Sequence, residues 1–117
     1  MTDAPTEIRL SRDKRTLRVA FADEIHEIPA ELLRVESPSA EVQGHDPSQK
    51  TIVPGKRDVE IIGIEPVGNY AIRLRFDDLH STGIYGWDLL RRMGRDGRTM
   101  MEAYEEALAA EGKTRDR

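Results

Sequence analysis

Asp77, Asp78 and His80 are the residues whose types and spacing could do chemistry. An imidazole beside carboxylates can bind iron, zinc or manganese, since these metals accept nitrogen and oxygen ligands. In that interpretation His45 or Glu41, from a long preceding loop, completes a weak divalent-metal site. In the alternative interpretation, the two carboxylates cap a turn and the imidazole makes a structural hydrogen bond.

Ser37 and Ser39 are the candidate nucleophiles. A nucleophilic serine needs an activating base and an oxyanion hole. No Gly-x-Ser-x-Gly motif surrounds either serine, and Pro38 between them is typical of a turn. We therefore expect these serines to shape a turn, and we expect the protein not to be an enzyme.

Basic side chains form local groups, comprising Lys14, Arg15, Arg91, Arg92, Arg95 and Arg98. Such groups can contact phosphate or an acidic partner, or they can pair with Asp88, Glu102 and Glu105. The net charge of -4 gives no global attraction to nucleic acid. The glycine-containing segments also lack the Lys-Ser/Thr ending of a phosphate-binding loop. We expect ion pairing at these positions and no nucleic-acid partner.

Tyr70, Tyr85 and Trp87 could line a ligand pocket. Aromatic residues make up only 5 % of the sequence, so we expect all three to belong to a thin core.

The composition limits the compartment and the classes of site. A chain of 117 residues without cysteine fits a single domain, residues 1–117, and excludes disulfides, thiolate zinc sites and cysteine-bound clusters. The first twenty residues contain no apolar run typical of a signal peptide. No segment approaches the roughly 20 apolar residues of a membrane span. We therefore expect a cytoplasmic protein with no membrane partner.

Hydrophobic alternation predicts a small, mostly antiparallel β-sheet in an α+β domain. The expected strands span residues 7–10, 16–21, 25–28, 59–64, 70–76 and 84–85. The Ile61-Ile62 pair indicates either burial on both faces or a bulge. A helical turn begins at Pro29, and one long loop occupies residues 35–57.

Two helices are expected at the C-terminal end. The first begins at Trp87 and stops at Gly94. The second begins at Thr99, with Glu102 completing a capping box, and ends at Gly112. Its apolar stripe consists of Met101, Tyr104 and Leu108. This stripe either packs on its own domain or is offered to a partner or to a second copy, which makes the helix a candidate homo-oligomer interface.

Several landmarks occur together in a specific order. They are Leu33-Arg34, residues 37–42, residues 67–71, Phe76-Asp77-Asp78 with His80, and Gly83-Ile84-Tyr85 with Trp87. In this order and spacing they resemble the gamma-butyrobetaine hydroxylase-like N-terminal domain family, which includes free-standing bacterial proteins. The resemblance spans residues 6–95 and leaves 96–117 as a C-terminal helix and tail.

The resemblance implies a lost metal site. Hydroxylase-type members hold a structural zinc with three cysteines and a histidine. The matching positions here are Ser37, Ser39, Val42 and His80. A closed zinc site needs four nitrogen or sulfur ligands, so we expect no zinc and no resident cofactor. The oxygenase activity belongs to a separate domain with a two-His-one-carboxylate iron site, and no His-x-Asp or His-x-Glu spacing occurs here.

Leu79 stands where the family motif usually has glycine. If that turn needs a positive φ, leucine costs about 1–2 kcal/mol there. Our main hypothesis is a non-enzymatic accessory or protein-interaction domain with an unidentified protein partner. The alternative is a metal- or small-ligand-binding protein centred on His80, Asp77 and Asp78.

Overall fold

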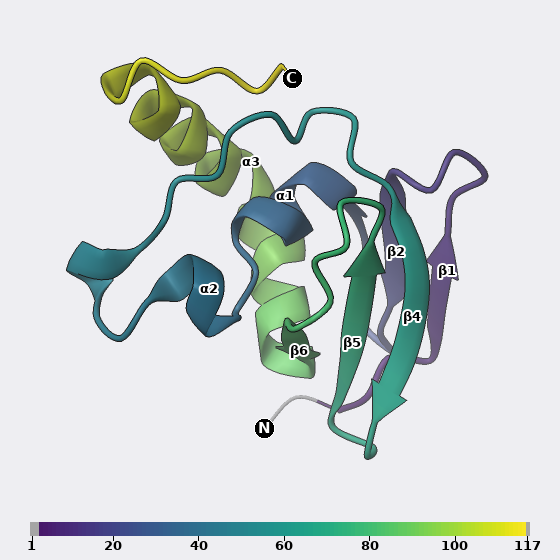
Figure 1. Ribbon diagram of the computed structural model, residues 1–117. Helices are drawn as coiled ribbons and strands as arrows, with labels where there is room; N and C mark the ends of the chain where they lie inside the picture. Colours follow the sequence, from purple (N-terminus) through teal and green to yellow (C-terminus); the bar gives the residue numbers. More distant parts are fainter. Residues whose placement is uncertain (1–2, 117) are drawn as a thin grey trace.

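The computed structural model describes residues 3–116, which form two three-stranded antiparallel sheets and three α-helices (Figure 1). The first sheet has the order β1 (Glu7–Leu10), β2 (Thr16–Ala20) and β3 (Ile25–Pro29). The second has the order β4 (Ile61–Val67), β5 (Ala71–Phe76) and β6 (Ile84–Gly86). The predicted α+β class is confirmed, although the strands divide between two sheets.

A β-bulge interrupts the pairing of β4 with β5. The register shifts between Ile61 and Gly63, so that Ile62 is the extra residue. Ile61 is fully buried, whereas Ile62 is exposed. Of the two alternatives for this pair, the bulge is therefore the correct one.

The long segment between the sheets is partly helical. Helix α1 (Ala30–Val35) follows Pro29, and α2 (Ala40–Gln43) and a 3₁₀ turn (Pro47–Gln49) lie within the expected loop. The segment is fastened to the body, because Lys50 pairs with Glu36 at 2.7 Å and the Tyr104 hydroxyl donates to the Val53 carbonyl.

A single helix, α3 (Trp87–Ala110), replaces the two helices expected at the C-terminal end. The prediction that Gly94 stops a helix is wrong. A Cβ atom at Gly94 would overlap the His26 ring, so this glycine permits close packing of α3 on β3. Thr99 lies inside the helix and caps nothing. Gly112, at a φ of +68°, follows the end of the helix as expected.

The main core lies between the two sheets and the helices α1 and α3. Its fully buried side chains include Leu17, Ile28, Leu32, Leu33, Ile61, Leu74, Phe76, Tyr85, Leu90 and Met93. A second, smaller cluster joins Tyr104 and Leu108 of α3 to Val35, with Ile52, Val53 and Met101 beside it. The C-terminal stripe therefore packs on the chain's own residues. Within the described residues, no helix is long and apolar enough to cross a membrane.

The residues after α3 are attached to the body (Figure 1). The backbone N–H groups of Gly55 and Arg57 each donate at 3.0 Å, to the carbonyls of Thr114 and Arg115. The Arg115 guanidinium pairs at 2.6 Å with Glu31, a carboxylate buried in α1. These bonds hold the segment before β4 between the tail and the rest of the domain.

Candidate functional site

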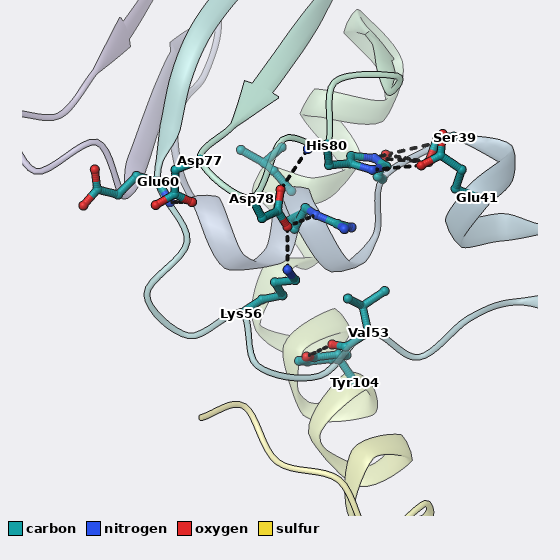
Figure 2. Close-up of polar contacts among 12 residues, drawn as sticks. Ser39, Glu41, Val53, Lys56, Glu60, Asp77, Asp78, His80 and Tyr104 are labelled. Atoms are coloured by element: carbon teal, nitrogen blue, oxygen red, sulfur yellow. Dashed lines mark hydrogen bonds and ion pairs between the residues drawn. The ribbon is translucent and has the colours of Figure 1, made fainter. Parts of the chain in front are cut away.

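The candidate site joins the segment after α1 to the turn after β5. His80 Nε2 lies 3.0 Å from Ser37 Oγ and 3.3 Å from Ser39 Oγ, and the two hydroxyl oxygens are 3.1 Å apart. Ser37 is 0 % exposed and His80 7 %. Figure 2 shows the His80 ring pointing toward Ser39 and Glu41. The structure therefore brings together residues about 40 positions apart in the sequence.

Glu41 completes a chain of polar groups, because its Oε2 lies 3.3 Å from His80 Nδ1. The carboxylate favours a proton on Nδ1, which leaves Nε2 to accept from a serine hydroxyl. Carboxylate, imidazole and hydroxyl follow one another as in a serine hydrolase. A Cβ at Gly83 would overlap Ser37 Oγ, so the hydroxyl has no space for a substrate on that side.

His80 is held in its neutral form. Burial lowers the pKa of His80 below its ordinary value of 6.5, and the nearby Arg34 cation lowers it further. The Glu41 carboxylate acts in the opposite direction but does not reverse the shift. A neutral imidazole can both donate and accept, which matches its position between a carboxylate and two hydroxyls.

Asp78 belongs to a different set of contacts. Its Oδ2 accepts from Arg34 Nε at 2.7 Å and lies 2.6 Å from Lys56 Nζ, while Oδ1 accepts from the His80 backbone N–H at 3.0 Å. Burial alone would raise the pKa of the Asp78 carboxyl. The hydrogen bond from Lys56, with those from the other two donors, lowers this pKa to about 2. The carboxylate thus balances two half-buried cations (Figure 2).

Asp77 and His45 do not join the cluster. Asp77 Oδ1 accepts from the Glu60 backbone N–H at 3.1 Å, so it links the turn after β5 to the segment before β4. His45 is exposed on the 35–57 segment. Among residues 3–116, no group of three or more His, Cys, Asp or Glu side chains could hold a metal ion. The side chains proposed for a site at His80, Asp77 and Asp78 therefore do not converge on one point.

Val42 lies in α2 and is buried. Ser37, Ser39 and Val42 therefore all lie inside the protein, and the two serines contact His80 directly. The serine hydroxyls form hydrogen bonds with the buried histidine.

Leu79 has a φ of +74° and is 86 % exposed. The turn after β5 therefore needs the left-handed conformation that glycine adopts without strain. The turn keeps its shape with leucine, since the Leu79 N–H donates to Phe76 O at 3.0 Å and the Phe76 N–H donates to His80 O at 2.9 Å.

The arginines of α3 are mostly paired. Arg91 contacts both Asp23 and Glu24 and lies over the Phe21 ring, with its guanidinium carbon 4.2 Å from the ring centroid. Arg95 Nε lies 2.7 Å from Glu24. Ion pairing was expected here, but the sequence did not indicate that the β2–β3 turn supplies the carboxylates. The expected pair of Arg98 with Glu102 is present at 3.4 Å.

The three aromatic residues have different environments. Tyr85 is fully buried, and its hydroxyl donates to the Leu33 carbonyl. Trp87 is half-buried and donates from Nε1 to the Asn69 carbonyl at 3.1 Å. Tyr70 is 61 % exposed, so its assignment to the core is wrong. It lies in the β4–β5 turn rather than in β5, and therefore does not share the inward face of that strand.

Comparisons with known proteins agree with this fold and with these motifs. Residues 8–91 match the family model described as gamma-butyrobetaine hydroxylase-like, N-terminal. The chain therefore belongs to the gamma-butyrobetaine hydroxylase-like N-terminal domain family. No curated protein matches the chain.

Three of the solved structures that are similar to it are described below. Two are NMR solution structures: one is 39 % identical with a TM-score of 0.85 and covers 99 % of this chain and 92 % of its own. The other is 40 % identical with a TM-score of 0.83, and the match covers 97 % of this chain and 86 % of the other. The third is a crystal structure from Acidithiobacillus ferrooxidans ATCC 23270, described as a DUF971-family protein of unknown function. It is 40 % identical with a TM-score of 0.64, and the match covers 77 % of this chain and 91 % of the other.

Proposed function

We propose that this protein is a non-enzymatic protein-interaction domain, and that Leu79 is an anchor that a partner protein buries. The single observation that carries the proposal is that Leu79 is both strained and 86 % exposed. A non-glycine residue at this backbone conformation costs about 1–2 kcal/mol. The side chain recovers little of that cost within its own chain.

The surroundings of Leu79 favour a fixed presentation. Asp78 and His80 on either side of it are held by hydrogen bonds to buried groups. A side chain carried by backbone that is already held in one conformation costs less to order when a partner covers it. Strained backbone that the surrounding structure maintains is found mainly at functional positions.

The enclosed polar cluster supports a role other than catalysis. Ser37, Ser39 and His80 hydrogen-bond one another inside the protein. A nucleophile must be reachable by its substrate, whereas this hydroxyl is surrounded by protein. The absence of cysteine from the sequence fits a reducing compartment, and we expect the partner to be met in the cytoplasm.

Site-specific cross-linking tests the proposal. Photo-leucine is placed at Leu79 and, as a matched control, at the exposed position Arg98 on α3, and soluble extract of the source cells is irradiated with each protein. We expect one reproducible adduct from photo-leucine at position 79. Unlabelled protein should prevent its formation by competition, whereas an unlabelled Leu79→Gly variant should not. No adduct at position 79, or the same adduct from position 98, would refute the anchor.

A further inference from the structure

The tip of the β4–β5 hairpin and the first turn of α3 enclose a surface cavity of about 430 Å³. The residues that define its chemistry are Asp3, Asn69, Tyr70, Trp87 and Asp88. Two of these side chains are aromatic and two are carboxylates. The cavity is separate from the His80 cluster, because it lies at the opposite end of β5.

The hairpin holds the Trp87 ring by a hydrogen bond and contacts the Tyr70 ring. Trp87 Nε1 donates to the Asn69 carbonyl at 3.1 Å. Gly68 has a φ of +54°, and a Cβ atom there would lie 2.9 Å from Tyr70 Cε1. Glycine at position 68 therefore lets the Tyr70 ring lie against the turn. Rings that are already positioned cost little to order when a ligand binds.

The charged side chains that line the cavity are both acidic. Neither Asp3 nor Asp88 forms an ion pair with any residue between 3 and 116, whereas Asp23, Glu24 and Asp78 are each paired with arginine or lysine. The N-terminal end of α3 contributes about half a positive charge. Two full carboxylate charges exceed this contribution, so the cavity favours a cation.

We propose that this cavity binds an arginine or lysine side chain from a basic segment of a partner protein. A guanidinium or ammonium group is attracted to the faces of tryptophan and tyrosine. The carboxylates of Asp3 and Asp88, which line the same cavity, neutralise its charge. The inference rests on the proposed interaction function only in that the occupant is a protein.

Trp87 is the single tryptophan of the sequence, so its emission reports directly on the cavity. The probe is the peptide acetyl-Gly-Ser-Arg-Gly-Arg-Ser-Gly-amide, and the matched probe carries citrulline in place of both arginines. We expect a saturable change in emission with the arginine peptide. We expect the citrulline peptide to bind at least about fivefold more weakly, since it keeps the shape but loses the cation.

Variants separate this site from general electrostatics. Asp88→Asn and Tyr70→Leu should each weaken binding of the arginine peptide at least about threefold. Asp96→Asn, at an exposed position on the same helix, makes the same change in net charge and should leave the affinity unchanged. Circular dichroism verifies that each variant is folded.

Absence of a saturable change, equal binding of the citrulline peptide, or equal losses from Asp88→Asn and Asp96→Asn would each overturn the inference. Leu79→Gly should not alter binding of this peptide. Failure of the peptide with a persistent adduct at position 79 would refute the cavity and leave the interaction function standing. Peptide binding without that adduct would refute the Leu79 anchor and leave the cavity standing.

Discussion

The buried polar residues and the exposed apolar residues around β5 differ in whether their own chain supplies contacts for them. The polar groups of Ser37, His80 and Asp78 all find partners inside the chain. Tyr70 and Leu79, in contrast, are large apolar side chains that their own chain leaves uncovered. Buried polar groups that are satisfied in this way stabilise one arrangement of the fold. The proposed interaction function therefore assigns contact with a partner to the exposed side chains and not to the buried polar groups.

The largest expected effect comes from building a zinc site into the cluster of Ser37, Ser39 and His80. The triple variant Ser37→Cys, Ser39→Cys and Val42→Cys places three thiols beside His80 and should bind one zinc ion. At free zinc about a thousandfold above the dissociation constant, binding adds about 4 kcal/mol to the free energy of unfolding. Elemental analysis and urea unfolding measure the two quantities.

The control for this variant adds His80→Ala to the three cysteines. This protein should lose most of the zinc affinity, because only three ligands remain. Zinc bound equally well without the histidine, or no zinc in the triple variant, would show that these four positions do not form one site.

The second effect removes the carboxylate that balances two cations. Asp78→Asn leaves Arg34 and Lys56 half-buried without their charge partner. We expect the free energy of unfolding to fall by about 2–3 kcal/mol, less than for a fully buried pair because some solvent reaches these groups. Urea denaturation measures the loss. Asp77→Asn is the matched control and should cost less than about 1 kcal/mol, since Asp77 accepts only from the Glu60 backbone N–H and asparagine keeps an accepting oxygen.

The third effect is a dependence of stability on pH. The folded-state pKa of His80 is lowered below 6.5, so the unfolded chain binds a proton more readily than the folded protein does. The contribution of neutral His80 to the free energy of unfolding is complete above pH 6.5 and is lost as the pH falls below 6.5. The slope is at most about 1.4 kcal/mol per pH unit for one proton.

Urea unfolding between pH 5 and pH 8 measures this slope. His80→Gln should flatten it, because the amide keeps polar contacts and does not titrate. His45→Gln, at an exposed histidine, should leave the slope unchanged. Protonation of Asp78 lowers the stability only at much lower pH, between the ordinary pKa of 3.8 and the folded-state pKa of about 2. An unchanged slope in His80→Gln would contradict the assignment.

The sequence predicted those elements whose cause is local. Alternation in residues 70–76 identified β5, which begins one residue later, at Ala71. The Ile61-Ile62 pair indicated either burial on both faces or a bulge, and the structure shows the bulge. The family resemblance matched Ser37, Ser39 and His80 to one site, and the structure places the three in contact. A positive φ at Leu79 was raised only as a condition, and the structure shows that this condition holds.

The errors concern residues whose environment depends on distant parts of the chain. Gly94 has the local signal of a helix end, but it is required for packing against His26. Asp78 is adjacent to the histidine motif, yet its partners come from α1 and from the 35–57 segment. Tyr70 continued the alternation of β5, but the turn at Gly68 places it outside the strand. No pattern within a short window could reveal these contacts.

The Leu79→Gly variant, with the smallest expected change in stability, tests the central claim most directly. Its stability and its binding are measured in the same preparation. Relief of the positive φ, less the entropic cost of glycine, should raise the free energy of unfolding by about 0.5–1 kcal/mol. The same variant should fail to compete for the adduct formed by photo-leucine at position 79. A variant that is more stable and no longer binds would establish Leu79 as an interaction residue maintained at a cost to the fold. A variant that competes as well as the native protein would contradict the account.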